Sequence, residues 1–460
     1  MALLTYPWVF DLPLRGRTPF LAYGFGLSRL KTDRSGYGVR DASVWRGLLG
    51  LTDAVVEDVD LDVEAGRVVA HVRVRKGAAL RCSRCLARCP RYDRGQGRRR
   101  WRHLDAGVLT VWIEADAPRV QCRACGVNVA HVPWAHAGTG HTHDFARQVA
   151  WCATKMSKSA VTVLMRIAWR TVGAIVERYW RDVQDCFDRF ENLTRIGIDE
   201  ISYKKGRKYL VIAVDHDTGR LLWAGVGRDT ATVQEFFDLL GPERCAKITL
   251  VSADAARWIA KAVAARCPNA VQCADPFHVI AWATDALDQV RRDAWNTAQG
   301  GVRDTRRARH KSTGPAKAYM QIRYALWKNP EDLTANQHAK IAWIAKTDPR
   351  LHRAYMIKEG LRHVFTVKGQ EGKHALDRWL SWAARCRIPE FTRLAKKIKR
   401  HRPTIDATLE HGLSNALIES TNTKIRLITR TAYGFHDPQA LIALALLTLG
   451  GYAPTLPGRT

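Results

Sequence analysis

The chain has 460 residues, more than one hydrophobic core usually organises, so we expect several domains. It carries 73 lysines and arginines against 44 aspartates and glutamates, which gives a formal charge of +29. A charge of this sign attracts phosphate, so the composition favours a nucleic-acid partner over a basic surface without specific purpose.

Neither export nor membrane insertion is expected. Residues 1–10 are apolar but lack the basic region and the small-residue cleavage site of a signal peptide. The longest late apolar run, residues 440–451, is too short to span a bilayer. We therefore expect a cytoplasmic protein whose 11 cysteines are reduced.

Residues 1–40 show no sustained period, and we treat them as an amino-terminal extension without an assigned role. Apolar and polar residues then alternate through residues 59–63 and 68–74, on the two sides of a turn at Gly66. A period of two across a glycine turn predicts a β-hairpin.

Two Cys-x-x-Cys pairs follow this hairpin, formed by Cys82, Cys85, Cys122 and Cys125. Each pair can bring two thiolates to one Zn²⁺, which prefers four such ligands in a tetrahedron. Residues 108–114 alternate like a strand between the pairs, so we predict a zinc-ribbon domain over residues 41–135. Buried free cysteines or redox pairs are the alternatives, and Cys89 or a nearby histidine could replace a ligand. These histidines are His131, His136, His141 and His143.

Residues 136–190 are predicted to form a helix-turn-helix domain. Helical apolar spacing runs through residues 145–156, 159–169 and 171–183. Two short helices with a tight turn between them can enter a DNA major groove, although a plain helical bundle has the same pattern. We expect the lysines of this domain on phosphate and the second-helix residues on base edges. The candidates are Lys155, Lys158, Arg166, Arg170, Thr171 and Arg178.

An α/β core is predicted over residues 191–279. Its elements follow the order strand, strand, strand, helix, strand, helix, strand, which is the order of a ribonuclease H-like fold. It places Asp199 at the end of the first strand and Asp254 after the fourth. The strands are residues 195–199, 207–215, 220–226, 247–252 and 270–273, and the helices are residues 232–240 and 255–266.

Residues 280–402 are helical, basic and rich in tryptophan, and residues 403–460 return to the core. A segment this long that leaves and re-enters one site should form its own helical core, so we predict an all-helical insertion. Its tryptophans are expected mainly in that core, with stacking on unpaired bases as the alternative. One basic run is a candidate clamp for flanking or target DNA, or else a spacer whose charge aids solubility. Its residues are Arg306, Arg307, Arg309 and Lys311.

Three carboxylates have the setting of a two-metal site. Asp199 and Asp254 each follow a short apolar run, and Glu419 lies on a predicted helix whose polar residues recur every three or four positions. Hard divalent cations need shared oxygen ligands from separate elements, and two such ions support in-line displacement at phosphorus. The pattern therefore indicates an enzyme that cuts and joins DNA.

An Asp-x-x-His step, Asp275 with His278, directly follows the predicted fifth strand. Asp275 is the alternative second aspartate, and both residues could orient a catalytic carboxylate or contact DNA. Asp275 could instead cap a helix that begins at Pro276.

Together these blocks resemble the DDE transposases of bacterial insertion sequences, in particular the ISL3 family, over roughly residues 41–450. The resemblance implies a zinc ribbon and a helix-turn-helix that bind DNA ends, and a ribonuclease H-like core that uses Mg²⁺ or Mn²⁺. It assigns the catalytic triad to Asp199, Asp254 and Glu419. It rests on the two cysteine pairs and on residues 196–200, 202–209, 274–280 and 414–435.

The expected function is that of a DNA transposase. Its partners would be the terminal inverted repeats of the element and double-stranded target DNA, bound by a homodimer or a larger synaptic assembly in the nucleoid. Asn422 and Arg426 are further candidate DNA contacts. A zinc-ribbon regulator would leave the carboxylates without a role, and a ribonuclease H-like nuclease would keep them but lack strand transfer.

Overall fold

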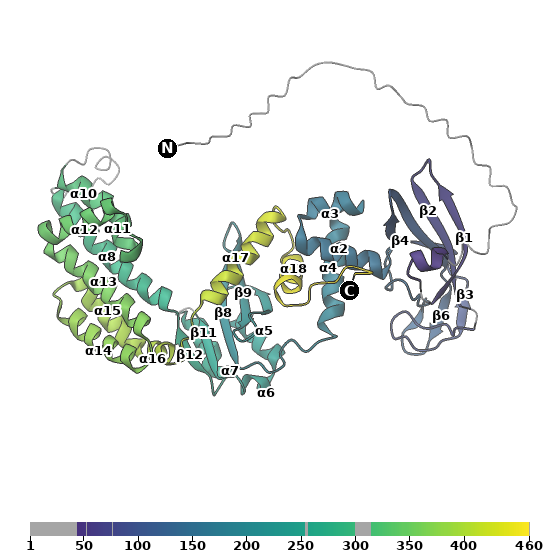
Figure 1. Cartoon of the computed structure of the whole chain (residues 1–460). Helices are drawn as coiled ribbons and strands as arrows, with labels where there is room; N and C mark the ends of the chain where they lie inside the picture. The colour runs from purple at the N-terminus through teal and green to yellow at the C-terminus, as the bar shows by residue number, and fades with distance from the viewer. Residues whose placement is uncertain (1–43, 52, 76, 254–255, 300–313, 460) are drawn as a thin grey trace, which may run out of the picture.

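The computed structural model describes residues 44–459 except residues 52, 76, 254–255 and 300–313. Figure 1 shows three parts in a row, with a β-rich amino-terminal part at one end and a bundle of helices at the other. A mixed sheet and the carboxy-terminal helices lie between them.

The amino-terminal part contains two sheets. The first has the order β1-β2-β5-β4 and the second has the order β3-β6-β7. The predicted hairpin is confirmed, because β1 and β2 pair antiparallel around the turn before Arg67. The strands are β1 (Ala54–Asp62), β2 (Arg67–Val74), β3 (Arg91–Asp93), β4 (Arg98–Ala106), β5 (Leu109–Asp116), β6 (Arg119–Cys122) and β7 (Gly126–Val129).

Three helices follow: α2 (His143–Lys155), α3 (Lys158–Met165) and α4 (Trp169–Gln184). The side chains of Thr142 and Ser157 accept hydrogen bonds from backbone N–H groups and so cap α2 and α3. Arg166 ends α3 in the left-handed conformation, and the chain bends by 102° into α4. Within the described ranges no single helix could cross a membrane, and only the bent pair of α3 and α4 reaches the necessary length and apolarity together.

The central sheet has five strands in the order β10-β9-β8-β11-β12. β9 runs antiparallel to β8 and β10, whereas β11 is parallel to β8 and β12. The predicted order of strands and helices is confirmed, with one additional short helix, α6. The elements are β8 (Arg195–Lys204), β9 (Lys208–Asp215), β10 (Leu221–Val226), α5 (Thr230–Leu240), α6 (Pro242–Cys245), β11 (Leu250–Ala253), α7 (Arg257–Arg266) and β12 (Val271–Ala274).

The prediction that Asp199 ends the first strand is wrong. β8 continues to Lys204, and this last residue pairs with Lys208 of β9. The outer part of the hairpin is held by backbone pairing and carries mostly polar residues, so the apolar pattern could not reveal it. Asp199 therefore lies in the middle of a strand, and both of its neighbours, Ile198 and Glu200, are paired with residues of β9.

Helices cover both faces of the sheet. On one face, α5 and α7 pack against Ile196 and Ile198 of β8. On the other face lie α17 (Ala416–Thr431) and α18 (Pro438–Leu449). The buried residues of α2, α3 and α4 belong to the same hydrophobic core as α18, so the predicted segments 136–190 and 403–460 are packed together.

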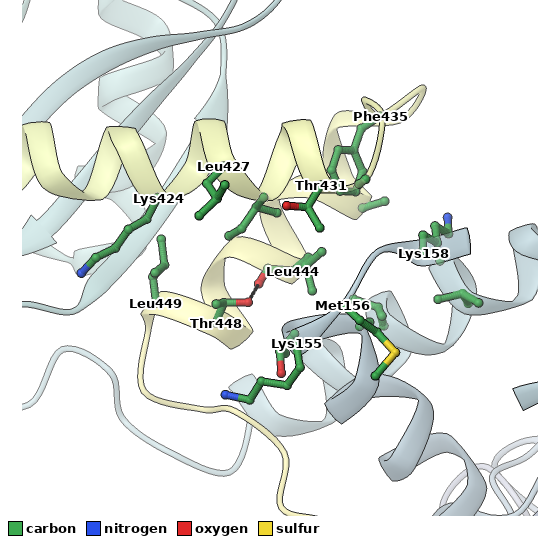
Figure 2. Close-up of a pocket in the computed structure, with 18 residues that line it drawn as sticks. Lys155, Met156, Lys158, Lys424, Leu427, Thr431, Phe435, Leu444, Thr448 and Leu449 are labelled. Atoms are coloured by element: carbon green, nitrogen blue, oxygen red, sulfur yellow. Dashed lines mark hydrogen bonds between the residues drawn. The ribbon is translucent and has the colours of Figure 1, made fainter. Parts of the chain in front are cut away.

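A cavity of about 340 Å³ lies in this shared core, between α2, α3 and α4 on one side and α17 and α18 on the other (Figure 2). Its walls are mainly apolar, including Val176, Phe435 and Leu444. Lys155 and Lys424 also line it. The cavity marks where the helix-turn-helix region meets the carboxy-terminal helices.

The predicted insertion is helical throughout the residues that the structure describes between Pro276 and His411. It has its own hydrophobic core, which includes Leu287, Leu361, Leu376 and Phe391. Its helices are α8 (Pro276–Ala298), α10 (Pro315–Gln321), α11 (Arg323–Trp327), α12 (Ala335–Thr347), α13 (Pro349–Val367), α14 (Gly369–Arg385), α15 (Pro389–Arg400) and α16 (Arg402–His411), with a 3₁₀ turn at Pro330–Asp332.

The insertion leaves and re-enters the core at neighbouring points, as predicted. The Thr408 hydroxyl donates to the carbonyl of Ala274, at the end of β12, over 2.7 Å. The backbone N–H of Asn415 donates to Asp275 over 3.3 Å, which joins the residue before α17 to the residue before α8. These two hydrogen bonds hold the two ends of the insertion together.

Gly197 of β8 allows α17 to approach the sheet closely. A Cβ atom at this position would lie 2.4 Å from Cδ1 of Ile418 and 2.9 Å from Nε2 of His216. Both distances are shorter than a van der Waals contact, so any larger residue would push α17 away. A glycine inside a strand pattern is the sequence signal for such an approach.

Gly197→Ala should therefore lower the free energy of unfolding by about 1–3 kcal/mol, measured by urea denaturation. Ile418→Ala removes the atoms that the new methyl group meets, so it is the matched background. In that background the cost of Gly197→Ala should shrink. Equal costs in both backgrounds would show that the Ile418 contact does not set the position of α17.

Candidate functional site

Three aspartates follow one row of paired residues across the central sheet. Ile198 of β8 lies beside Ala253 of β11, and Ala253 lies beside Ala274 of β12. The next residue in each segment is an aspartate: Asp199, Asp254 and Asp275. Asp254 is outside the described residues.

Asp199 is held by the helix that packs on its strand. The side-chain amide of Asn422 on α17 donates to Oδ2 of Asp199 over 2.8 Å, and the backbone N–H of Glu200 donates to Oδ1 over 2.8 Å. Asn422 is only 4% exposed in this structure, and its predicted contact with DNA stays a prediction. Its amide orients a carboxylate that lies 223 positions away in the chain, and no local sequence pattern indicates this pairing.

Glu419 is exposed on α17, three residues before Asn422 and next to Ile418. Residues three apart on a helix emerge on the same side, one turn from each other. The carboxylate of Glu419 therefore starts one helical turn from the residue that binds Asp199. The predicted placement of Glu419 on a helix is confirmed.

Asp275 has a different environment. It is 3% exposed and caps α8, because its Oδ2 accepts hydrogen bonds from the backbone N–H of His278 over 3.2 Å and lies 2.8 Å from Nδ1 of the same residue. Its Oδ1 accepts the N–H of Asn415. Asp275 therefore caps α8, as the helix-cap alternative predicts, and it joins the start of α8 to the start of α17. A catalytic role for Asp275 or His278 stays a prediction.

The donor atoms near Asp199 suit a hard divalent cation. Asp199 supplies carboxylate oxygens, and the side-chain oxygen of Asn422 is buried without a hydrogen-bond partner among the residues described. Glu419 can add a further carboxylate from one helical turn along α17. Oxygen ligands of this kind favour Mg²⁺ or Mn²⁺ over softer metals.

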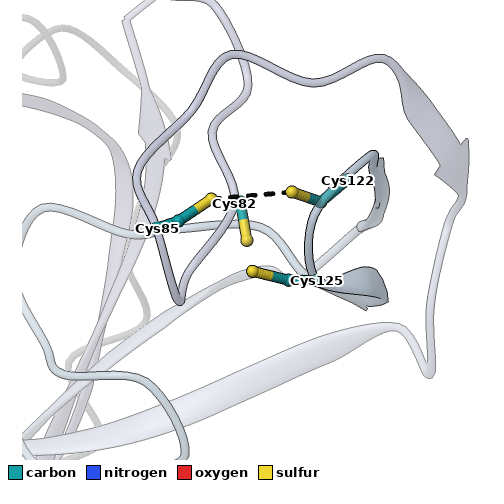
Figure 3. Close-up of side chains that lie close together, drawn as sticks. All are labelled: Cys82, Cys85, Cys122 and Cys125. Carbon is teal, nitrogen blue, oxygen red and sulfur yellow. Dashed lines mark hydrogen bonds between the residues drawn. The ribbon is translucent and has the colours of Figure 1, made fainter.

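The four predicted zinc ligands are brought together by two short loops (Figure 3). The Sγ atoms of Cys82, Cys85, Cys122 and Cys125 all lie within 4.8 Å of one another. Around a tetrahedral Zn²⁺ with bonds of about 2.3 Å, sulfurs are about 3.8 Å apart, so the group fits this ion. In the described part of the chain it is the only group of this kind.

Backbone N–H groups of the loops stabilise thiolates. Burial acts to raise the pKa of Cys82, but hydrogen bonds from the N–H groups of Cys85 and Arg84 outweigh it and lower that pKa to about 6. The N–H of Cys125 is the main cause that lowers the pKa of Cys122. A deprotonated sulfur is the form that binds zinc.

The alternative ligands lie outside this group. Cys89 donates to the carbonyl of Ala87 over 3.3 Å. His136, His141 and His143 line a cavity beside α4, where burial lowers the pKa of His143 to about 4. His131, two residues after the end of β7, is half-buried and does not belong to the cysteine group.

Several candidate DNA contacts of the helix-turn-helix are engaged within the protein. Lys158 lies 3.4 Å from the centre of the Trp169 ring, so it ties α3 to α4. Arg166 donates to the carbonyl of Val108 over 3.0 Å, and Arg178 donates to that of Ala137 over 3.1 Å. Each of the three cations therefore has a contact within the protein, and their DNA contacts stay predictions.

Arg170 remains available. It is exposed in the first turn of α4 and makes no hydrogen bond or ion pair with any residue that the structure describes. Thr171 beside it is half-buried, and Lys155 lines the cavity of Figure 2. Arg426 is exposed on α17, one turn beyond Asn422. The basic run of the insertion, Arg306, Arg307, Arg309 and Lys311, lies outside the described residues.

Comparison with protein families gives three matches. A family model described as a transposase of the ISL3 type matches residues 196–445. A model for the zinc finger of the transposases of IS204, IS1001, IS1096 and IS1165 matches residues 79–125. A model for the helix-turn-helix domain of transposase family ISL3 matches residues 130–180.

Curated relatives agree with these matches. The transposase for insertion sequence element IS1557 of Mycobacterium tuberculosis, in strains CDC 1551 and H37Rv, is 58% identical over 436 residues, which cover 92% of this chain and 98% of that protein. The transposase for IS1001 of Bordetella parapertussis is 24% identical over 403 residues, which cover 87% of this chain and 96% of that protein.

The cysteine group predicts about one Zn²⁺ per chain, measured by elemental analysis of the purified protein. Cys122→Ser should lose the metal and make the amino-terminal part sensitive to protease, because thiolate ligation is coupled to folding. Cys89→Ser is the matched control and should keep the metal. Zinc loss in both variants, or in neither, would contradict the assigned ligand set.

Proposed function

The chain belongs to the ISL3 family of transposases and is a DNA transposase, and on this premise we propose that Asp199, Asp254 and Glu419 form its catalytic triad. Membership of this family favours the predicted transposase over the two alternatives, a regulator and a nuclease without strand transfer.

The paired row across the sheet is the observation that carries this assignment. Asp199 and Asp254 each follow a residue of adjacent parallel strands that are directly paired, Ile198 and Ala253. Asp275 follows the same row one strand further, but its oxygens accept hydrogen bonds that hold α8 and α17. An aspartate committed in this way is a poor metal ligand, which favours Asp254 as the second member.

We also propose that the central sheet is a ribonuclease H-like core. In chain order its strands are arranged 3-2-1-4-5, with the second strand antiparallel to the others. Helices lie on both faces, and the third carboxylate comes from a helix that returns after the insertion. This arrangement supports the proposed fold and places two candidate carboxylates on β8 and α17.

The three carboxylates would bind Mg²⁺ or Mn²⁺, which polarises phosphate oxygens and lowers the pKa of a bound hydroxyl. Other residues of the chain hold these carboxylates in position. Asn422 fixes the Asp199 carboxylate through its 2.8 Å hydrogen bond, and Gly197 lets α17 lie close enough for this bond to form. Arg426 is exposed one turn further along α17, where a cation can meet a DNA phosphate.

DNA ends would be recognised by α4. Helices α2 and α3 and most of α4 lie within the matched helix-turn-helix segment, residues 130–180, and Arg170 is exposed in the first turn of α4. Early residues of such a helix reach base edges in the major groove. We further propose that the insertion's basic run holds target or flanking DNA, and that two chains or more pair the ends of the element.

Asp199→Ala, Asp254→Ala and Glu419→Ala should each reduce cleavage and strand transfer by at least about a thousandfold, because each removes a ligand of a catalytic cation. Binding of end DNA should stay within a few-fold of the wild type. Metal-dependent joining of two DNA molecules is the assay.

Asp275→Asn is the matched control for this series. It keeps an acceptor for the helix cap, so activity should largely survive. A dead Asp275→Asn protein with normal stability, together with an active Asp254→Ala protein, would show that Asp275 is the second ligand.

Arg170→Ala should weaken binding to end DNA by about 1–3 kcal/mol and relax the preference at one base position. Arg178→Ala removes a similar charge from the same helix, but this arginine is bonded to Ala137. It should change affinity for end and scrambled DNA alike. Fluorescence anisotropy with both DNAs at two salt concentrations distinguishes these results, and an unchanged preference in Arg170→Ala would refute base reading by this residue.

A further inference from the structure

The helical insertion carries an exposed tryptophan, Trp382, and among the residues that the structure describes no cation lies over its ring. Three tryptophans of the described chain are more than a third exposed: Trp169 at 37%, Trp327 at 39% and Trp382 at 41%. Lys158 covers the ring of Trp169 at 3.4 Å, and Arg323 covers that of Trp327 at 4.1 Å. Among these three, Trp382 alone has a ring left for another partner.

Trp382 lies in a hollow of about 650 Å³ between α13 and α14. One edge of its ring rests on α13 at Gly360, where a Cβ atom would lie 3.0 Å from Cζ3. This contact fixes the ring edge against a helix backbone. The rest of the side chain is partly exposed, in a position set by the two packed helices α13 and α14.

The hollow is rich in arginine. It is lined by Arg353, Arg378 and Arg385, and its one carboxylate, Asp377, is paired with Arg402 at 2.5 Å. Arg378 precedes Trp382 by four residues, so the two side chains emerge on the same face of α14. Arg378 is exposed and forms no ion pair within the described ranges.

The other two arginines are held in place. Arg385 donates to the carbonyl of Ser381 over 3.1 Å, and Arg353 donates to the carbonyl of Cys386 over 3.4 Å. Both use only part of their five N–H donors in these contacts, so each can still bind an anion. The hollow thus combines an aromatic surface with oriented guanidinium groups.

We propose that this hollow binds an unpaired nucleotide of the DNA substrate, with the base stacked on Trp382 and its phosphate on Arg378. Stacking on an aromatic ring accepts any base, and guanidinium groups match the geometry of phosphate. A duplex offers no free base face, so the site selects strand ends or locally opened DNA. The inference rests on the chain acting on DNA and not on the identity of the catalytic triad.

The test compares two DNAs that differ only in bases. One is a labelled duplex with a three-nucleotide thymidine overhang, and the other carries an overhang of the same length made of abasic sites. Both overhangs have the same phosphates, so the ratio of the two affinities isolates base stacking. Full-length protein is used without Mg²⁺ or Mn²⁺, so failure of the proposed triad cannot alter the result.

Wild-type protein should bind the thymidine overhang about tenfold more tightly than the abasic one. Trp382→Ala should bring this ratio close to one, whereas Trp327→Ala, the matched control with a similarly exposed ring in the same domain, should keep it. Arg378→Gln should weaken binding of both overhangs. A wild-type ratio of one, or an unchanged ratio in Trp382→Ala, would overturn the proposal.

A second measurement covers the case in which Trp382→Ala does not fold. Wild-type protein is irradiated with an overhang that contains 5-iododeoxyuridine, and the crosslinked peptide is identified by mass spectrometry. A crosslink at Trp382 supports the proposal. Crosslinks confined to other parts of the chain, such as the helix-turn-helix, contradict it.

Discussion

The close packing of α17 on β8 is the contact on which the rest of the structure depends. Gly197 removes the side chain that would separate them, and Ile418 occupies the space. One turn further along α17, Asn422 binds Asp199. Since α17 also carries Glu419, this single contact brings a helix from the end of the chain to the strand that carries Asp199.

The insertion can be large because it is closed at its base. Thr408 bonds to Ala274, and Asn415 bonds to Asp275, so the two ends of the excursion are fixed to each other before α17 begins. The bundle has its own hydrophobic core, which does not include the residues that pack on β8. The position of α17 is thus protected from changes elsewhere in the insertion, and the bundle is free to carry surface features such as the hollow at Trp382.

The helix-turn-helix is connected to the catalytic part through a shared core. Buried residues of α2 and α4 pack with α18, and the cavity of Figure 2 lies at this contact. A bound DNA end would therefore be held in a defined relation to α17 instead of on a free tether. The same packing means that a fragment ending at residue 190 would expose the apolar face that α18 covers.

The sequence by itself determined the features that depend on neighbouring residues. Alternation and helical spacing predicted the hairpin, the strand and helix order of the core and the helical insertion, because local periodicity follows from which face is buried. Paired cysteines predicted the zinc group, since the two loops bring each pair together over four residues. The family resemblance assigned the function correctly, because the motifs that carry it are short blocks of neighbouring residues.

Only the tertiary structure decided the roles that depend on distant partners. Asp275 was the alternative to Asp254, and one of its oxygens accepts the N–H of Asn415, 140 positions away in the chain. Asn422 was expected on DNA and is buried against Asp199. Arg178 was expected at a base and is bonded to Ala137. Each outcome depends on a partner far away in the chain, and a side chain's hydrogen-bonding groups do not specify which partner the fold will supply.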